Sequence, residues 1–343
     1  MTKCDWSAGA ELLANLFPRE RLEPAVVAWA DSASRRQIWS VAFSGGPDSL
    51  AVLLLLWAHW PARRASLRAL HFDHGMRGRE SRADASYCRR VCDALKVKMV
   101  IGRWPGNHRG ASEAEARTAR MAFFAQHARV VWLGHQQDDI AESMLMRLAR
   151  GSGAGGLSAP RPIQRLNAGR FHLRPLLTLK KKEIVAALAQ AKLVWREDST
   201  NARGDYFRNR IRRDVLPAWA DAAERDALAG AARSRLLLEE DDAALDRWVD
   251  EIAPLESDGR LILSRLAAKP RAVVRRALHR WLAAKVPRGD LSRQAFDLLL
   301  EAVVRGAPTR QSMGPNGFAV IARGELIFEQ IGRRMVNSTG AAN

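Results

Sequence analysis

The sequence predicts an α/β fold, in which a parallel, doubly wound (Rossmann-like) sheet is followed by a mostly helical C-terminal domain. Between about residues 37 and 217, short apolar runs of strand length alternate with longer segments of helical spacing. This alternation is typical of a parallel sheet with helices on both faces. A glycine-rich turn follows the first expected strand and polar motifs follow later ones, at the positions where such sheets bind ligands.

The expected elements follow from the apolar periodicity along the chain. Residues 1–36 form an amphipathic helical lead-in, 37–217 the α/β domain, 218–335 a mainly helical domain and 336–343 a polar tail. The strands expected in the α/β domain are Ile38–Phe43, Leu67–Phe72, Val97–Ile101 and Val130–Leu133. Its expected helices are Leu50–Trp60, Ser81–Leu95, Ser112–His127 and Asp138–Arg150. The elements expected near the end are the helix Ser292–Val304 and the short β-like runs Gly317–Ile321 and Gly324–Phe328.

The chain of 343 residues is strongly basic, with 55 Lys and Arg against 37 Asp and Glu and a net charge of +18. Such a charge calls for a polyanionic partner, or else it only solvates the surface. Arg is plentiful and the charge is not gathered in one tail. We therefore expect a nucleic acid as the partner rather than a membrane.

The cysteines and the N-terminus indicate a cytoplasmic protein. The three cysteines are an odd, small number, and Cys88 and Cys92 have CxxxC spacing rather than the CxxC of zinc or redox sites. The first residues include acids and lack the long apolar core of a signal peptide. The strongest apolar run, Leu50–Trp60, is too short to span a bilayer.

The segment Ser44–Ser49, SGGPDS, lies between two apolar runs and therefore joins a strand to a helix. Glycine permits φ > 0 and a close approach to a ligand, while hydroxyl groups and the first helical amides donate hydrogen bonds where the helix dipole is positive. A generic turn would instead use Asp or Ser as an N-cap. The residues expected to hold nucleotide phosphates are Ser44, Gly45, Gly46, Pro47, Asp48 and Ser49. Asp48 would orient the loop or help to hold Mg²⁺.

The segment Gly134–Asp139, GHQQDD, directly follows the fourth expected strand and precedes Glu142. On a helix Asp138 and Glu142 are four residues apart, and Asp139 and Glu142 are three apart, so either pair can converge on Mg²⁺ or on a substrate ammonium group. The simpler interpretation is that the acids cap and stabilise the first helical turn. The phosphate loop in the same sheet favours the site.

Two further motifs could belong to the same site. The segment His71–Arg77 closes the second expected strand, and Arg77 is a candidate for neutralising phosphate or substrate charge. The segment Arg150–Leu157 contains four glycines. It is interpreted either as a lid over the site, with Gly151–Gly156 as its mobile part, or as a helix C-cap with a linker.

Basic and aromatic residues gather between Trp195 and Pro217. Phosphate contacts and base stacking both need these residue types, although surface charge often serves only solvation. The arginines that crowd this segment are Arg208, Arg210, Arg212 and Arg213, with Lys180–Lys182 upstream.

Taken together, these motifs resemble the tRNA(Ile)-lysidine synthetases, a family of the PP-loop (N-type) ATP pyrophosphatases. The resemblance covers roughly residues 38–217, and the motifs that carry it are SGGPDS, HGMR, GHQQDD with Glu142, RGSGAGGL, RPLL, EDSTN and YFRNRIR. The chain departs from the family pattern at three positions: Gln136 replaces a frequent His, Met76 replaces Leu and Ser143 replaces Thr. The first departure puts in doubt any role that needs an imidazole at position 136.

The resemblance implies a ligase that uses ATP and Mg²⁺. The wobble cytidine of a tRNA(Ile) with a CAU anticodon would be adenylated at its C2 oxygen, releasing pyrophosphate. The ε-amine of L-lysine would then attack C2 and release AMP. The product, lysidine, changes codon reading from AUG to AUA. The helical C-terminal domain would bind the tRNA body, and a homodimer is left open.

The resemblance assigns roles to residues of this chain. The catalytic candidates are Asp48, Asp138, Asp139, Glu142 and Arg77; the tRNA or substrate contacts are His135, Arg208, Arg210 and Arg212; and the Mg²⁺ ligands are Asp48 and Asp139. How the three acids after the fourth strand divide the binding of lysine, the metal and the proton stays open at this point.

Three rival interpretations differ in their chemistry. A small-molecule amide synthetase could use the same phosphate loop, but the basic C-terminal region weighs against it. A tRNA thiolase of the same fold needs cysteines near its site, and Cys88 and Cys92 lie on an expected helix in the wrong pattern. A non-catalytic RNA-binding protein would not need an intact phosphate loop with intact acids.

Overall fold

The computed structural model describes residues 5–75, 78–104, 112–197, 207–285 and 291–330. The chain divides into two compact units, residues 1–239 and residues 240–343. Residues 218–239, which the sequence analysis grouped with the C-terminal domain, therefore belong to the first unit. The physical reason is a small apolar cluster, in which Trp219 and Ala231 pack with Ile140 and Leu177.

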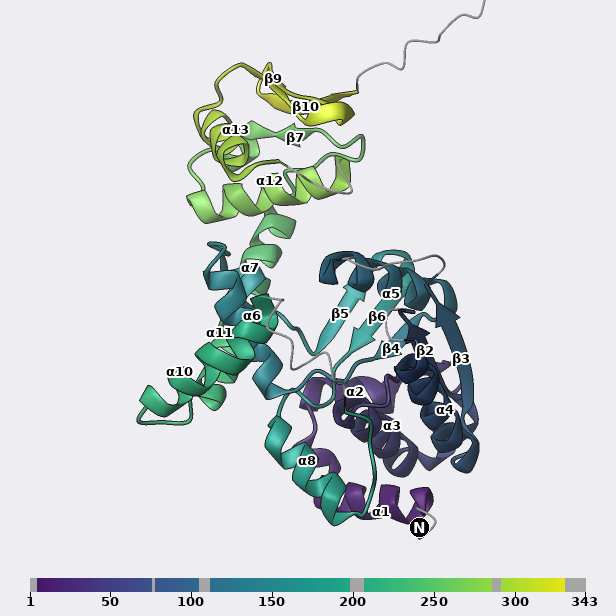
Figure 1. The fold of residues 1–343 in the computed structure, drawn as a ribbon. Helices are drawn as coiled ribbons and strands as arrows, with labels where there is room; N and C mark the ends of the chain where they lie inside the picture. Colours follow the sequence, from purple (N-terminus) through teal and green to yellow (C-terminus); the bar gives the residue numbers. More distant parts are fainter. Residues whose placement is uncertain (1–4, 76–77, 105–111, 198–206, 286–290, 331–343) are drawn as a thin grey trace, which may run out of the picture. The chain divides into compact units, whose positions relative to one another are not determined.

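The first unit is built on a six-stranded sheet in the order β3-β2-β1-β4-β6-β5 (Figure 1). Neighbouring strands are parallel except for the edge strand β5, which is antiparallel to β6. The strands are β1 (Trp39–Ala42), β2 (Leu67–Asp73), β3 (Lys98–Arg103), β4 (Val130–Trp132), β5 (Ile163–Leu166) and β6 (Arg170–Leu173). The predicted parallel, doubly wound sheet is confirmed, and β5 and β6 are additions to it.

Helices precede, connect and follow these strands. They are α1 (Trp6–Leu16), α2 (Pro24–Ser32), α3 (Pro47–His59), α4 (Arg79–Ala94), α5 (Glu113–His127), α6 (Gln137–Leu148), α7 (Ala154–Leu157), α8 (Lys181–Gln190), α9 (Phe207–Arg210) and α10 (Leu216–Ala222). A π-helical turn, Ile211–Val215, joins α9 to α10. Helix α11 (Ala227–Ile252) begins in the first unit, and its sequence continues into the second.

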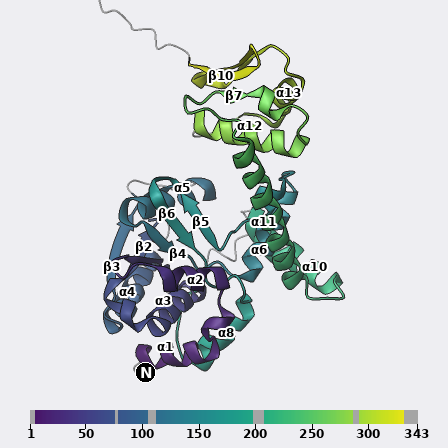
Figure 2. The same cartoon turned by 180° about the vertical axis from the view of Figure 1, so that it is seen from behind.

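Each face of the large sheet has its own apolar core, because alternate strand residues point to opposite faces. Trp39, Val41 and Trp132 face the larger core, which α1, α3, α4 and α8 complete. Figure 2 shows α1, α3 and α8 from behind. On the other face, Leu70 and Val131 pack against Phe123 and Phe124 of α5.

Helix α3 lies in the middle of the larger core. All of its residues from Leu50 to Trp57 are buried, as expected for a helix that is apolar all round. No helix among the described residues has the length and the apolar character needed to cross a membrane.

The second unit packs two helices with a four-stranded antiparallel sheet in the order β7-β10-β9-β8. Its elements are α12 (Arg271–Lys285), α13 (Arg293–Arg305), β7 (Leu261–Ile262), β8 (Thr309–Ser312), β9 (Gly317–Ala322) and β10 (Glu325–Gln330). Trp281 is fully buried at the centre of its core. The sequence predicted β9, β10 and α13 but not the short strands β7 and β8.

Candidate active site

The two principal motifs meet where the order of the strands reverses. Strand β1 pairs with β2 on one side and with β4 on the other, so the crossovers that leave β1 and β4 diverge. A crevice forms at the carboxyl ends of the strands at such a point. Ser44–Ser49 follows β1 there, and Gly134–Asp139 follows β4. A Cβ atom on Gly134 would lie 2.9 Å from the Asp48 carbonyl carbon, so the two segments touch.

The loop after β1 has a backbone shape that requires glycine. Gly45 has φ +93°, and a Cβ atom there would lie 3.2 Å from side-chain atoms of both Tyr87 and Cys88. The Arg196 amide donates a hydrogen bond to the Gly45 carbonyl at 2.9 Å. The loop is thus held between α4 and the segment after α8, with its position set by backbone contacts.

The two serines of the loop are hydrogen-bonded around the start of α3. The Ser49 hydroxyl donates to the Gly46 carbonyl at 2.9 Å and accepts from the Ser44 amide at 3.2 Å, and the two serine hydroxyls lie 3.1 Å apart. Gly46 is the N-cap of α3, and no side chain caps the helix. The first amides of α3 therefore have no acceptor within the helix, an arrangement that suits an anion.

Asp48 has one carboxylate oxygen in an ion pair and the other without a partner. Its Oδ2 lies 2.5 Å from the ammonium group of Lys181, whereas the buried Oδ1 accepts no hydrogen bond from any residue that the structure describes. Burial raises the pKa of Asp48, and Lys181 opposes this shift. A buried, unpaired carboxylate oxygen beside an anion site fits a cation such as Mg²⁺.

No group of three or more His, Cys, Asp or Glu side chains within the described ranges could hold a metal ion by itself. A magnesium ion at Asp48 would therefore take its remaining ligands from phosphate oxygens and water, as Mg²⁺ commonly does.

The first acids after β4 organise the backbone around the start of α6. Asp139 Oδ2 accepts a hydrogen bond from the Gln136 amide at 2.9 Å in a capping box. Asp138 Oδ2 accepts from the Lys181 amide at 2.9 Å, which fixes the start of α8 beside α6. Asp138 thereby helps to place Lys181 opposite Asp48.

Asp139 and Glu142 are paired with two arginines from α9 and the π-helical turn. Arg208 lies 2.5 Å from Asp139 Oδ1 and 2.8 Å from Glu142 Oε2. Arg212 lies 2.5 Å from Glu142 Oε1 and 3.5 Å from Asp139 Oδ1. Glu142 is fully buried, so these guanidinium groups compensate a charge that water cannot reach. We call these four residues the acid–arginine cluster.

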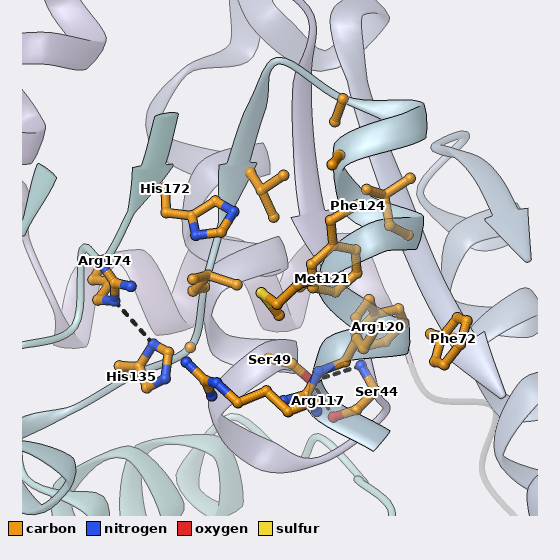
Figure 3. A pocket seen from close by; sticks show the side chains of 18 of the residues that line it. Ser44, Ser49, Phe72, Arg117, Arg120, Met121, Phe124, His135, His172 and Arg174 are labelled. Carbon is orange, nitrogen blue, oxygen red and sulfur yellow. Dashed lines mark hydrogen bonds between the residues drawn. The ribbon is translucent and has the colours of Figure 1, made fainter. Parts of the chain in front are cut away.

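The lining of the crevice also includes a buried arginine and two histidines (Figure 3). Arg174 donates from Nε to His135 Nδ1 at 3.1 Å, and it also donates to the Arg161 carbonyl and to Gln164. Burial lowers the pKa of Arg174 to about 10, that of His172 to about 4, and that of His135 well below its usual value. His135 is therefore neutral, and because its Nδ1 accepts, its proton is on Nε2.

These walls enclose a cavity of about 1130 Å³ that extends from the phosphate loop over the sheet face beside α5. Arg117 and Arg120 reach into it from α5 (Figure 3). Its lining includes eight arginines against four aspartates, so the cavity favours a polyanion. The arginines are Arg117, Arg120, Arg129, Arg165, Arg170, Arg174, Arg208 and Arg212.

The cavity brings together most of the residues singled out from the sequence. Those that line it are Ser44, Gly46, Asp48, Ser49, His135, Asp139, Arg208 and Arg212. Glu142 lies behind the arginines that contact it, and the guanidinium of Arg210 lies over the Phe207 ring. Arg77 and Met76 lie outside the described residues, as do residues 198–201 of the EDSTN motif. The glycine-rich loop contains the short helix α7, and its role as a lid stays a prediction.

Several residues of the site were not assigned roles from the sequence. Lys181 belongs to a basic run that was noted only for its charge, and Arg174 was noted only as part of RPLL. Arg117 and Arg120 are three residues apart on the expected helix Ser112–His127, so their shared face was detectable. Nothing in the local pattern indicated that this face lines the cavity.

Comparisons with known proteins place this site in context. The model of the PP-loop domain matches residues 19–219. Curated proteins named tRNA(Ile)-lysidine synthase match from Symbiobacterium thermophilum (36% identity, 70% of this chain and 55% of the relative), Xanthomonas axonopodis pv. citri (38%, 71% and 56%) and Bacillus licheniformis (32%, 81% and 61%). The chain thus spans little more than half the length of these relatives.

A solved U34-tRNA thiolase, NcsA from Methanococcus maripaludis, aligns with a TM-score of 0.47 and 14% identity over 67% of this chain and 78% of its own. This likeness is too low to bear on the fold or the function.

Replacing Arg208 by Met should lower the free energy of unfolding by about 2 kcal/mol, because Glu142 and Asp139 lose a charged hydrogen-bond partner in a buried setting. Denaturant titration measures the change. Arg213→Met is the matched control, since Arg213 pairs with Asp214 on the surface and should matter little. Equal stability of the two variants would contradict the compensating role of Arg208.

Replacing His172 by Gln should make the protein less sensitive to acid. The folded pKa of about 4 lies below the unfolded value, so the unfolded chain takes up the proton first as the pH falls from 6.5 towards 4. The contribution of neutral His172 to wild-type stability is fully present above that window and is lost within it. The loss is about 2 kcal/mol when discounted for the water-exposed part of the ring. Parallel pH–stability curves for the two proteins would show that burial does not hold His172 neutral.

Proposed function

Since the chain belongs to the PP-loop domain family, we propose that it is a tRNA(Ile)-lysidine synthetase. It would use ATP to activate the wobble cytidine of a CAU anticodon and join L-lysine to it. The observation that carries the proposal is the shared cavity, in which the start of α3, Asp48 and Asp139 line the same basic space. The names of the curated relatives support the choice of substrates.

ATP would bind with its β- and γ-phosphates at the start of α3. The free amides of that turn and the hydroxyls of Ser44 and Ser49 would hold the phosphate oxygens, and the positive end of the helix dipole would favour their charge. Asp48 would hold Mg²⁺ through its unpartnered Oδ1 together with those oxygens, and Asp139 is a second candidate ligand. When bound, the ion would neutralise charge on the departing pyrophosphate.

Lys181 would exchange its ion pair with Asp48 for one with the phosphates of ATP. Its ammonium group pairs with Asp48 Oδ2 at the mouth of the loop. A polyphosphate placed there offers it several acceptor oxygens with a larger charge. Lys181 would move to the phosphate and leave Asp48 to the metal, while the Asp138 bond to its amide keeps its backbone in place.

The acid–arginine cluster would change partners in the same way. In the structure, Arg208 and Arg212 neutralise Asp139 and Glu142. Phosphates of ATP and of the tRNA would attract the two guanidinium groups, because phosphate also accepts two parallel hydrogen bonds from Arg. The freed carboxylates would hold the ε-ammonium group of lysine and accept the proton it must lose before it attacks.

The reaction would proceed in two displacements. The C2 oxygen of the cytidine attacks the α-phosphate and pyrophosphate leaves, which replaces a poor leaving group by AMP. The deprotonated ε-amine then attacks C2 and AMP leaves. Arginines around the cavity would stabilise the negative charge that develops on the phosphates in both steps.

Recognition of the RNA would involve both walls of the cavity and the second unit. Neutral His135, oriented by Arg174, would donate its Nε2 proton to the target base or its phosphate. Arg210, beside the ring of Phe207, would contact the RNA backbone. The second unit would bind the tRNA body. A homodimer and a cytoplasmic location are part of the same proposal.

The properties of Cys88 and Cys92 argue against sulfur transfer as the reaction. Cys88 and Cys92 are buried on α4, and burial raises the pKa of both thiols, that of Cys92 to about 12. Thiols of this kind are poor nucleophiles and poor cluster ligands. Cys4 lies outside the described residues.

The direct test is an incorporation assay with ATP, Mg²⁺, labelled lysine and a tRNA(Ile) transcript bearing a CAU anticodon. We expect lysine on the wild-type product and a loss of at least about 100-fold with Asp48→Asn, because the variant loses the carboxylate that faces the phosphates. Asp93→Asn, an exposed change on α4, is the matched control and should retain activity.

Two outcomes of this assay would contradict the account. Normal turnover by Asp48→Asn would remove Asp48 from the site. Sulfur incorporation in place of lysine, with a sulfur donor supplied, would make the protein a thiolase.

A further inference from the structure

A second cavity, of about 400 Å³, lies at the amino-terminal edge of the large sheet, away from the phosphate loop. The segment before β1, the first residues of β1 and β2, and the turn between α5 and β4 enclose it. Its lining includes Arg36, Arg68, Arg129 and His127 and contains no Asp or Glu. The cavity is therefore a basic pocket separate from the carboxyl ends of the strands.

A buried hydroxyl group and an arginine lie side by side in this pocket. Ser40 of β1 is opposite Arg68 of β2 in the parallel register, and Arg68 is opposite Lys98 of β3. All three alternate with residues of the larger core, so they share the α5 face. Ser40 is only 1% exposed, and its hydroxyl has no hydrogen-bond partner among the described ranges of the chain. A buried donor without a partner is costly, and a ligand oxygen in the pocket would satisfy it.

The arginines of this pocket are not neutralised by acids of the chain that the structure describes. Within the described part of the chain, Arg36, Arg68 and Arg129 form no ion pair, whereas Arg19, Arg64 and others do. Arginines that line one cavity without an acid leave its positive charge uncompensated. An oxyanion would compensate this charge and accept hydrogen bonds from the guanidinium groups.

We propose that this second cavity binds a phosphate group of the tRNA strand whose target base enters the active site, an inference that rests on the proposed function. Ala128 and Arg129 line both cavities, so the basic surface is continuous from one to the other. Ser40 and Ser44 are separated by four residues of extended chain, roughly 13 Å at about 3.3 Å per residue. A few nucleotides on one side of the target base span that distance. The second cavity would therefore set the register of the strand in the active site.

Salt-dependent binding of the tRNA(Ile) transcript tests the site without any need for turnover. Each lost phosphate contact should reduce the slope of log affinity against log salt by about 0.7 to 0.9. We expect this reduction, with about tenfold weaker binding at low salt, for Arg68→Gln and for the loop variant Arg36→Gln. Arg89→Gln removes the same charge from the exposed surface of α4, which packs on the other face of the sheet, and should retain the wild-type slope.

Ser40→Ala separates a ligand contact from a structural role. If the hydroxyl donates to a phosphate, the variant should bind the transcript about threefold more weakly, with a melting temperature no lower than that of the wild type. A lower melting temperature with unchanged affinity would assign Ser40 to the fold and contradict its part in the site.

Inorganic phosphate distinguishes the two sources of the anion. If phosphate raises the melting temperature of the wild type and of Arg89→Gln but not of Arg68→Gln, while the tRNA slopes are all equal, the pocket binds free phosphate and the RNA assignment is wrong. Equal slopes with no phosphate effect would show that there is no anion site.

The outcome also separates this inference from the proposed function. Lysine incorporation by the wild type together with equal slopes would overturn only the second cavity. Altered slopes for Arg36→Gln and Arg68→Gln without any lysine incorporation would support the cavity and overturn the function.

Discussion

The arrangement of the site depends on the neutralisation of two buried carboxylates by two arginines of the same chain. Glu142 is fully buried and Asp139 nearly so, and an uncompensated charge in such a place costs several kcal/mol. Arg208 and Arg212 provide the compensation from one helical face, since they are four residues apart. Their contacts hold α9 and the π-helical turn against α6. The position of the segment after residue 206 is therefore set by electrostatics as well as by packing.

The same logic applies to Asp48, where Lys181 supplies the compensating charge. In both places a positively charged side chain of the protein forms an ion pair with an acid that the proposed reaction needs for a metal ion or an amine. The remaining arginines keep the cavity strongly positive, so a polyanion is the ligand that stabilises it most. Binding of an anion would redistribute the internal cations and free the acids. The cavity thus links the binding of phosphate to the binding of an ammonium group.

Much of the first unit could be predicted from the sequence because its signals are local. The apolar runs and the alternation of strand and helix indicate the parallel sheet, and the strand-to-helix position of SGGPDS indicates an anion site. Strands β5 and β6 could not be predicted, since they are short and partly polar and gain their pairing from β4. Strand β7 could not be predicted either, because it has only two residues.

The contacts within the site could not be predicted from local sequence patterns, because they join residues that are far apart in the chain. Lys181 is 133 residues from Asp48, and Arg208 is 66 residues from Glu142. The sequence suggested the acids and the arginines as separate groups, one for an amine or a metal and the other for RNA. Only the fold shows that they are partners. The link between Asp138 and the start of α8 has the same origin, because it joins a side chain to a backbone amide 43 residues away.

We expect that an anion must bind before the acids are free for lysine. Isothermal titration calorimetry of lysine measures this directly, first with the protein alone and then with the protein saturated with Mg²⁺ and an ATP analogue that cannot be cleaved between its α- and β-phosphates. We expect the analogue to tighten lysine binding by about tenfold or more, and lysine to tighten binding of the analogue by the same factor. Equal lysine affinity with and without the analogue would contradict it.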